Sequence, residues 1–141
     1  MIPNAPTIVN KGYNPTAFSK GVSSGEKAEI TGLFSELGDC PEVPEETLEA
    51  YAVIAAMGPT YFWFQWQTLS ELAKDFGLTE EAFREAFPKM INGAADTMFN
   101  SSMTHTEVMD LVPVKPLAED EEAIRKIYTS RLTALYGKLK G

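Results

Sequence analysis

The stretch that decides the fold is AAMGPTYFWFQW, from Ala55 to Trp66, where a Gly58-Pro59 break is followed at once by five aromatic residues. Proline's fixed φ angle and missing N–H stop one helix and suit the first turn of the next. At about 100° per residue, the aromatic side chains point around the whole circumference of that second helix. A single core cannot cover them all, so we expect this helix to be packed on two or more sides.

Two arrangements could cover such a helix. It could lie at the centre of a monomeric bundle, or it could form a subunit interface, where Trp and Tyr are favoured anchors. The interface is favoured, because few other helices are available to surround the aromatic segment. A second apolar stripe with helical spacing follows the N-cap Thr79 and is assigned to the same interface. The expected interface residues are Tyr61, Phe62, Trp63, Phe64 and Trp66, with Phe87, Met90, Ile91, Ala94 and Met98.

Charge and composition exclude several classes of partner. The formal net charge of -8 repels phosphate backbones and anionic lipid, so neither nucleic acid nor a membrane is an expected partner. Cys40 is the single cysteine, which excludes an internal disulfide and fits a reducing cytoplasm. No apolar run approaches the roughly 20 residues of a membrane span, and no leader sequence is recognisable. A cytoplasmic protein is expected.

Residues 1–43 read as a small α/β piece. Short strands and turns are expected over residues 1–22, including Ile8-Val9, because prolines and glycines interrupt short apolar runs. Ser23 and Glu26 form a capping box at the start of a helix, and Gly38 should close it as a left-handed cap. A short strand is possible over residues 39–43.

Residues 44–141 read as helix almost throughout, so the expected fold is mainly α, a helical bundle preceded by a short α/β piece. Proline and acidic residues open a helix that should end at Met57. Pro88 should kink its helix rather than stop it. The expected helices cover about residues 44–57, 60–76, 80–98 and 119–140, with a short helix or turn over 104–112.

Common catalytic and cofactor motifs are absent from the sequence. It contains no G-x-G-x-x-G, no G-x-x-x-x-G-K-[ST], no H-E-x-x-H and no G-x-S-x-G. The acidic clusters at 45–46, 80–81 and 119–122 occupy first turns of expected helices, where capping and solubility explain them. No catalytic residue and no metal ligand is therefore assigned.

Several short motifs, in order, carry a resemblance to a known family. They are IPNAP at 2–6, LFSELG at 33–38, EETLEA at 45–50, GPTY at 58–61, GL at 77–78 and GAA at 93–95. In these the chain resembles the C-terminal part of pyrroline-5-carboxylate reductase. The resemblance implies that residues 1–43 are the last strands and helix of a Rossmann domain and that residues 44–141 are an all-α dimerisation domain.

The resemblance also implies an activity. In that family a Rossmann domain binds NAD(P)H, the helical domain interleaves with its partner's, and the dimers often assemble further. Hydride passes to the C=N carbon of a cyclic imine between the two domains. Because the helical domains interleave, a homodimer is expected. The parent enzyme would use NADP or NAD. The glycine-rich cofactor turn would precede Met1, so no cofactor is expected on this chain alone.

The same resemblance implies candidate site residues. Asn4 would lie near the cofactor, and Glu45, Gly58 and Pro59 near the substrate. Lys115 could hold an anionic substrate, although a solvated lysine in a connector is an open alternative.

The chain also departs from the family pattern. Where the family has Ser-Gly-Ser before Gly-Pro, this chain has Ala55, Ala56 and Met57, and LVPVKPLAED at 111–120 replaces a Ser-Pro-Gly-Gly-x-Thr loop. The departures favour a second hypothesis, a non-catalytic helical interaction or small-molecule-binding module on the same scaffold.

Overall fold

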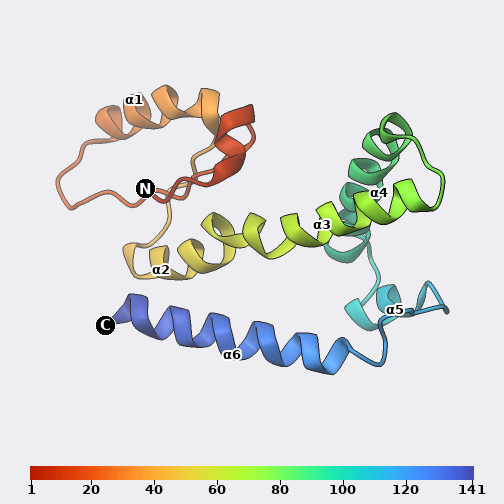
Figure 1. Cartoon of the computed structure of the whole chain (residues 1–141). Coiled ribbons are helices and arrows are strands. Elements are labelled where there is room, and N and C mark those ends of the chain that lie inside the picture. Colours follow the sequence, from red (N-terminus) through yellow and green to blue (C-terminus); the bar gives the residue numbers. More distant parts are fainter. The chain divides into compact units, whose positions relative to one another are not determined.

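The computed structural model describes all residues 1–141 and shows a mainly helical chain (Figure 1). Its strands are β1 Gly12–Tyr13 and β2 Gly38–Asp39. The α-helices are α1 Ser24–Phe34, α2 Leu48–Tyr51, α3 Gly58–Asp75, α4 Glu80–Asn100, α5 His105–Asp110 and α6 Glu121–Lys140. Three 3-10 segments, η1 Ala5–Val9, η2 Ser35–Leu37 and η3 Glu45–Thr47, and one π-helical segment, η4 Ala52–Ala56, complete the order. The expected fold class, mainly α with a short α/β piece at the N-terminal end, is confirmed.

The chain divides into two compact units. Unit 1 comprises residues 1–63 and 126–141, and unit 2 comprises residues 64–125. The division follows packing within the chain, whereas the boundary expected between residues 43 and 44 separates two kinds of architecture. That boundary stays a prediction.

Two short parallel strands organise the start of unit 1. β1 pairs with β2 in the register Gly12 opposite Gly38, and an isolated parallel bridge joins Thr16 to Glu42. Helix α1 makes the crossover that a parallel pair requires. The strand expected over residues 39–43 is therefore present as a two-residue strand and a separate bridge.

The short strand expected within residues 1–22 is present as β1, but two details of the α/β piece were wrong. Ile8 and Val9 do not form a strand but end the 3-10 segment η1, which Pro6 favours in its first turn and which Asn10 closes at φ 57°. Gly38 does not adopt the left-handed cap conformation: its φ of 130° and ψ of -166° place it in an extended region open to glycine. The reason is that Gly38 already begins β2.

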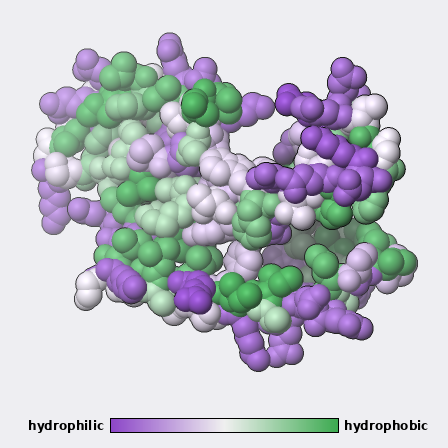
Figure 2. All heavy atoms as spheres, in the orientation of Figure 1, coloured by the Kyte–Doolittle hydropathy of each residue, from purple (hydrophilic) through white to green (hydrophobic).

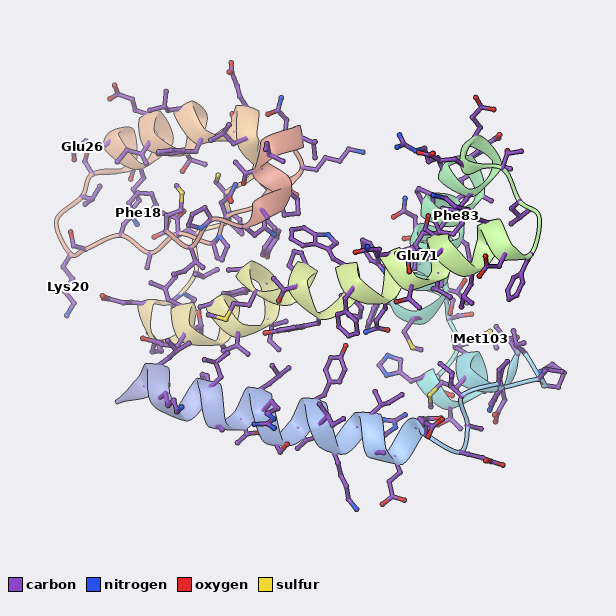
Figure 3. The ribbon with its side chains drawn as sticks, viewed as in Figure 1. Phe18, Lys20, Glu26, Glu71, Phe83 and Met103 are labelled. Carbon is purple, nitrogen blue, oxygen red and sulfur yellow. The ribbon has the colours of Figure 1, made fainter.

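The predictions for the N-terminal caps of two helices were right. The Ser23 hydroxyl accepts a hydrogen bond from the Glu26 N–H, and the Glu26 carboxylate accepts from the Ser23 N–H at 2.8 Å. The Ser23 hydroxyl also donates to the Glu26 carboxylate at 2.7 Å. This bond, together with the one from the Ser23 N–H, holds the pKa of Glu26 below its ordinary value, because both favour the charged carboxylate. Figure 3 shows Glu26 at the start of α1 and Phe83 on α4. Thr79 caps α4, which continues through Pro88 without a stop.

The expected single helix over residues 44–57 is instead three consecutive segments. η3 is followed by the single α-helical turn of α2 and then by η4, where the hydrogen bonds span five residues rather than four. The helix break itself falls at Met57, as the sequence predicted. π-helical turns of this kind occur where the backbone ladder is locally interrupted.

Few apolar side chains are buried. Val43, Val53 and Ala73 are the buried apolar residues, while 24 large apolar side chains are exposed. Figure 2 shows apolar side chains at the surface over much of the chain. An exposed apolar area of this extent is typical of a chain that covers it with another protein surface.

Gly38 gives a testable prediction about the strand pair. A Cβ at Gly38 would overlap the backbone of Gly12, and the positive φ adds strain, so Gly38→Ala should lower the free energy of unfolding by about 2 kcal/mol or more. Gly32→Ala is the matched control, because Gly32 lies in α1 with open space around it. The control should be neutral or stabilising by about 0.5 to 1 kcal/mol. Urea denaturation measures both, and equal effects would contradict the packing described.

Candidate functional site at the helix break

The break before α3 is the place where most candidate site residues meet. Met57 has right-handed helical angles, φ -85° and ψ -16°, so the backbone turns through the break much as in a helix. The interruption lies in the hydrogen bonds. Pro59 has no N–H to give to the Ala55 carbonyl four residues earlier, and the Thr60 N–H donates to Met57 at 2.9 Å.

Asn4 lies at this break. Its side-chain Nδ2 donates to the Ala55 carbonyl at 3.5 Å, and its Oδ1 accepts from the Tyr13 N–H at 3.0 Å. Both ends of the carboxamide are therefore occupied by backbone groups of unit 1. The cofactor contact expected for Asn4 stays a prediction.

The buried side chain of Asn14 binds the backbone of Asn4. It is 2 % exposed, and its Oδ1 accepts from the Asn4 N–H at 3.3 Å and from the Thr7 hydroxyl at 3.1 Å. Its own N–H donates to Asp39 at 2.7 Å. The buried amide thus ties η1 to both strands, and buried polar groups need such pairing to be tolerated. Nothing in the sequence distinguished Asn14 from an ordinary turn asparagine.

Two tyrosines fix the other side of the break. The Tyr61 hydroxyl donates to the Val53 carbonyl at 2.5 Å, and the Tyr128 hydroxyl of α6 donates to the Tyr61 carbonyl at 3.2 Å. Their rings meet edge to face with centroids 6.1 Å apart. Burial raises the pKa of Tyr61, and the neighbouring Tyr128 adds to the shift. Tyr128 lies in the helix expected over residues 119–140, but no pattern in the sequence indicates which group its hydroxyl binds.

The predicted substrate residues of unit 1 lie on both sides of the π-helical segment. Gly58 is buried and Pro59 half-buried at the start of α3, while Glu45 is exposed in the first turn of η3. Both tyrosine hydroxyls donate to backbone carbonyls. These side chains can therefore hold neighbouring groups in position. The substrate roles of Glu45, Gly58 and Pro59 stay predictions.

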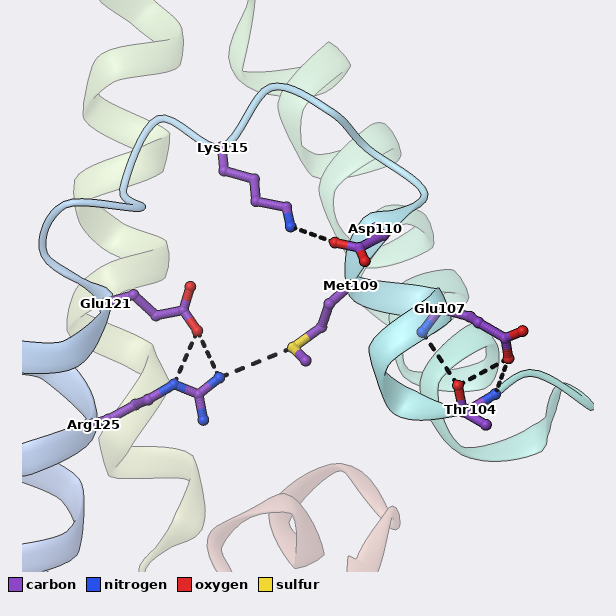
Figure 4. A network of polar contacts seen from close by, with 7 residues as sticks. All are labelled: Thr104, Glu107, Met109, Asp110, Lys115, Glu121 and Arg125. Carbon is purple, nitrogen blue, oxygen red and sulfur yellow. Dashed lines mark hydrogen bonds and ion pairs between the residues drawn. The ribbon is translucent and has the colours of Figure 1, made fainter.

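Lys115, the remaining predicted substrate residue, belongs to unit 2. Its Nζ pairs with Asp110 Oδ1 at 2.8 Å, and nearby Arg125 pairs with Glu121 at 2.6 Å and reaches the Met109 sulfur (Figure 4). The lysine charge is therefore balanced by a carboxylate. Its role toward an anionic substrate stays a prediction.

The expected interface residues fall into two groups. Phe62, Trp63 and Phe64 are 44 %, 46 % and 64 % exposed. Trp66 instead packs edge to face on Phe87 within unit 2, with centroids 6.1 Å apart. Of the others, Met90 and Ala94 are exposed, while Tyr61, Ile91 and Met98 are half-buried. The exposed rings have the character of an interface, and their partner stays a prediction.

The remaining surface features involve none of these residues. A shallow depression is lined by Thr79, Glu80, Glu81 and Arg84 at the start of α4, where Arg84 and Glu80 form an ion pair. No group of three or more His, Cys, Asp or Glu side chains is arranged to hold a metal ion. No helix has both the length and the apolar character needed to cross a bilayer.

The sequence is similar to curated pyrroline-5-carboxylate reductases. The protein from Corynebacterium melassecola is 24% identical over 136 residues, which are 96% of this chain and 50% of that protein. The Mycobacterium tuberculosis protein is 27% identical over 94 residues, 67% of this chain and 32% of that protein. The resemblance stated from the sequence is thus confirmed, and the chain spans half or less of the length of these relatives. No family model matches the chain.

Solved structures show the same fold. A Plasmodium falciparum pyrroline carboxylate reductase with NADP bound matches 96% of this chain and 59% of its own, with a TM-score of 0.75 at 21% identity. A pyrroline-5-carboxylate reductase from Coxiella burnetii matches 98% of this chain and 54% of its own, with a TM-score of 0.66 at 23% identity. At these identities the likeness shows the fold alone, and it supports the fold class expected from the sequence.

Tyr128 provides the prediction for this site. Tyr128→Phe removes the hydroxyl that donates to the Tyr61 carbonyl, and it should lower the free energy of unfolding by about 1 kcal/mol. Tyr136→Phe, on the same helix and also half-buried, is the matched control and should change stability by less than about 0.5 kcal/mol. Urea denaturation at fixed protein concentration compares them. A Tyr136 effect as large as that of Tyr128 would contradict a specific contact.

Proposed function

We propose that this chain is the C-terminal dimerisation and active-site-wall portion of a pyrroline-5-carboxylate-reductase-like, NAD(P)-dependent oxidoreductase that reduces a cyclic imine. The observation that carries the proposal is the similarity, along nearly the whole chain, to part of proteins with that name. The neighbour from Plasmodium falciparum holds NADP, which supports the same cofactor class for the parent of this chain. We place the enzyme in the cytoplasm, in keeping with its unpaired Cys40.

The exposed rings support dimerisation. Covering a large apolar side chain contributes about 1.5 to 3 kcal/mol, so the exposed parts of Phe62, Trp63 and Phe64 represent a sizeable unused stabilisation. Exposed aromatics next to one another on one helix are the anchors that subunit interfaces use. A second copy of the same chain would present the same rings, so a homodimer is the proposed partner arrangement, with higher assemblies built from it.

The hydride donor is proposed to bind outside this chain. The sequence has no glycine-rich dinucleotide fingerprint, and Asn4 is engaged with the backbone at the helix break. A Rossmann domain preceding residue 1 would supply that site in the parent protein. This chain alone is therefore proposed to be inactive as a reductase, with Glu45, Gly58, Pro59 and Lys115 contributing one wall of the site.

One observation favours the second function, a non-catalytic helical interaction or small-molecule-binding module. The connector after α5 contains Pro113 and Pro116, which lack N–H groups, and its Lys115 is paired with Asp110. Such a connector offers a poor anion site, because a bound carboxylate needs free N–H groups or an unpaired cation. A protein that keeps the scaffold but has lost the reaction would show these features.

The oligomer is tested with a charged substitution among the exposed rings. The unmodified chain should be a dimer at micromolar concentration, and Trp63→Glu should raise its dissociation constant about 30-fold or more, as loss of an interface anchor does. Ile8→Glu is the control, since Ile8 is 89 % exposed on η1 outside the proposed interface. Sedimentation equilibrium gives both constants. A monomeric unmodified chain at these concentrations would rule out the dimer proposal.

The reaction is tested separately. The full-length parent, supplied with NADPH and pyrroline-5-carboxylate or a simple cyclic imine, should oxidise the cofactor, while this chain alone under the same conditions should not. Absorbance of the reduced nicotinamide follows the reaction. If the parent dimerises but turns over no imine, the second function replaces the first.

A further inference from the structure

At the helix break, the Ala55 carbonyl lacks the backbone N–H donor that it would have in a regular helix. In an uninterrupted helix the Ala55 carbonyl would accept the N–H of residue 59, but residue 59 is proline. The next N–H, of Thr60, donates to Met57 instead. A half-buried carbonyl left without a donor costs free energy, so another group must serve it.

We propose that Asn4 is the positioning residue for the start of α3, and that its side-chain amide takes the place of the N–H that Pro59 lacks. The Asn4 Nδ2 meets the Ala55 carbonyl at 3.5 Å, a long hydrogen bond across 51 positions of sequence. The inference concerns a contact inside unit 1 and holds whether or not the proposed reaction is confirmed.

Asn4 is held firmly enough to do this. Its Oδ1 accepts the N–H of Tyr13 in β1, and its own N–H donates to the buried Asn14. The carboxamide is thereby oriented, because the oxygen end is fixed on the strand and the nitrogen end must face the helix. The direction of the first turn of α3 is set by a side chain that is anchored in the α/β piece.

The Tyr61 hydroxyl makes a similar contact two residues earlier in the chain, where it donates to the Val53 carbonyl at 2.5 Å. Two carbonyls of the π-helical segment are thus served by side chains from outside it. These two hydrogen bonds explain how η4 is stable next to a proline. Asn4 thereby has a role in positioning the backbone, which is separate from the cofactor contact expected from the sequence.

Asn4→Asp is the sharpest substitution. It keeps an oxygen that can accept from Tyr13 and replaces the NH2 donor to Ala55 with a second, negatively charged oxygen that can only accept. We expect amide hydrogen exchange at Met57 and Thr60 to accelerate roughly threefold or more, while exchange at Ser35, at the end of α1, stays within about twofold. Asn92→Asp, an identical charge change at an exposed position of α4, should leave all three amides within about twofold.

Pro59→Ala supplies the decisive comparison. It restores an N–H at residue 59 that can bond directly to the Ala55 carbonyl, so Asn4 should become dispensable. In the Pro59→Ala background, Asn4→Asp should change exchange at Met57 by less than about 1.5-fold. An equal acceleration in both backgrounds would overturn the proposal.

A second measurement does not depend on how well the proline variant folds. The carbonyl carbon of Ala55, followed by NMR in alanine-labelled protein, should shift upfield in Asn4→Asp as its donor is lost, with the Ala52 carbonyl unchanged, since that group accepts from the Met57 N–H. No shift at Ala55 would overturn the proposal, as would an equal shift at both carbonyls.

Discussion

The missing N–H of Pro59 is the constraint on which the rest of unit 1 depends. It interrupts the backbone ladder between α2 and α3 and leaves the Ala55 carbonyl for a side chain to serve. Asn4 comes from the N-terminal segment, and Tyr61 and Tyr128 hold the other side of the break. Segments from both ends of the sequence therefore meet at the residues around Pro59.

The second feature of the molecule is the imbalance between buried and exposed apolar side chains. Three buried apolar residues are far fewer than a stable chain of this length needs, since folding must offset a large loss of conformational entropy. The rings that follow Pro59 are part of the exposed set. The break therefore bears on both features, because α3 begins there and the exposed rings lie in its first two turns.

Much of the fold could be predicted from local chemistry. The capping box of Ser23, the N-cap Thr79 and the break at Pro59 depend on neighbouring residues, so the sequence was sufficient for them. What failed depended on distant residues. Gly38 is extended because it pairs with Gly12, and a helix propensity cannot report a strand partner 26 positions away. The carbonyls of the π-helical turn likewise accept from the side chains of Asn4 and Tyr61, which lie outside residues 44–57, so no pattern within that range could reveal these contacts.

The candidate site was predicted at the level of positions rather than contacts. The motif resemblance indicated Asn4, Gly58 and Pro59, and all three lie at the helix break. The contacts of the buried Asn14 and of the Tyr128 hydroxyl were not predicted. The sequence does not indicate which backbone group the side chain of an asparagine in a turn or of a tyrosine in a helix will bind.

The placement of the Asn4 oxygen also bears on what β1 can pair with. Along a strand, alternate N–H groups face opposite sides: that of Asn14 faces β2, whereas that of Tyr13 faces outward and is taken by Asn4. Ile2 donates to Pro15 on the same flank. An incoming strand would have to displace both contacts, so the chain's own first residues protect the outer edge of β1 against pairing with another strand.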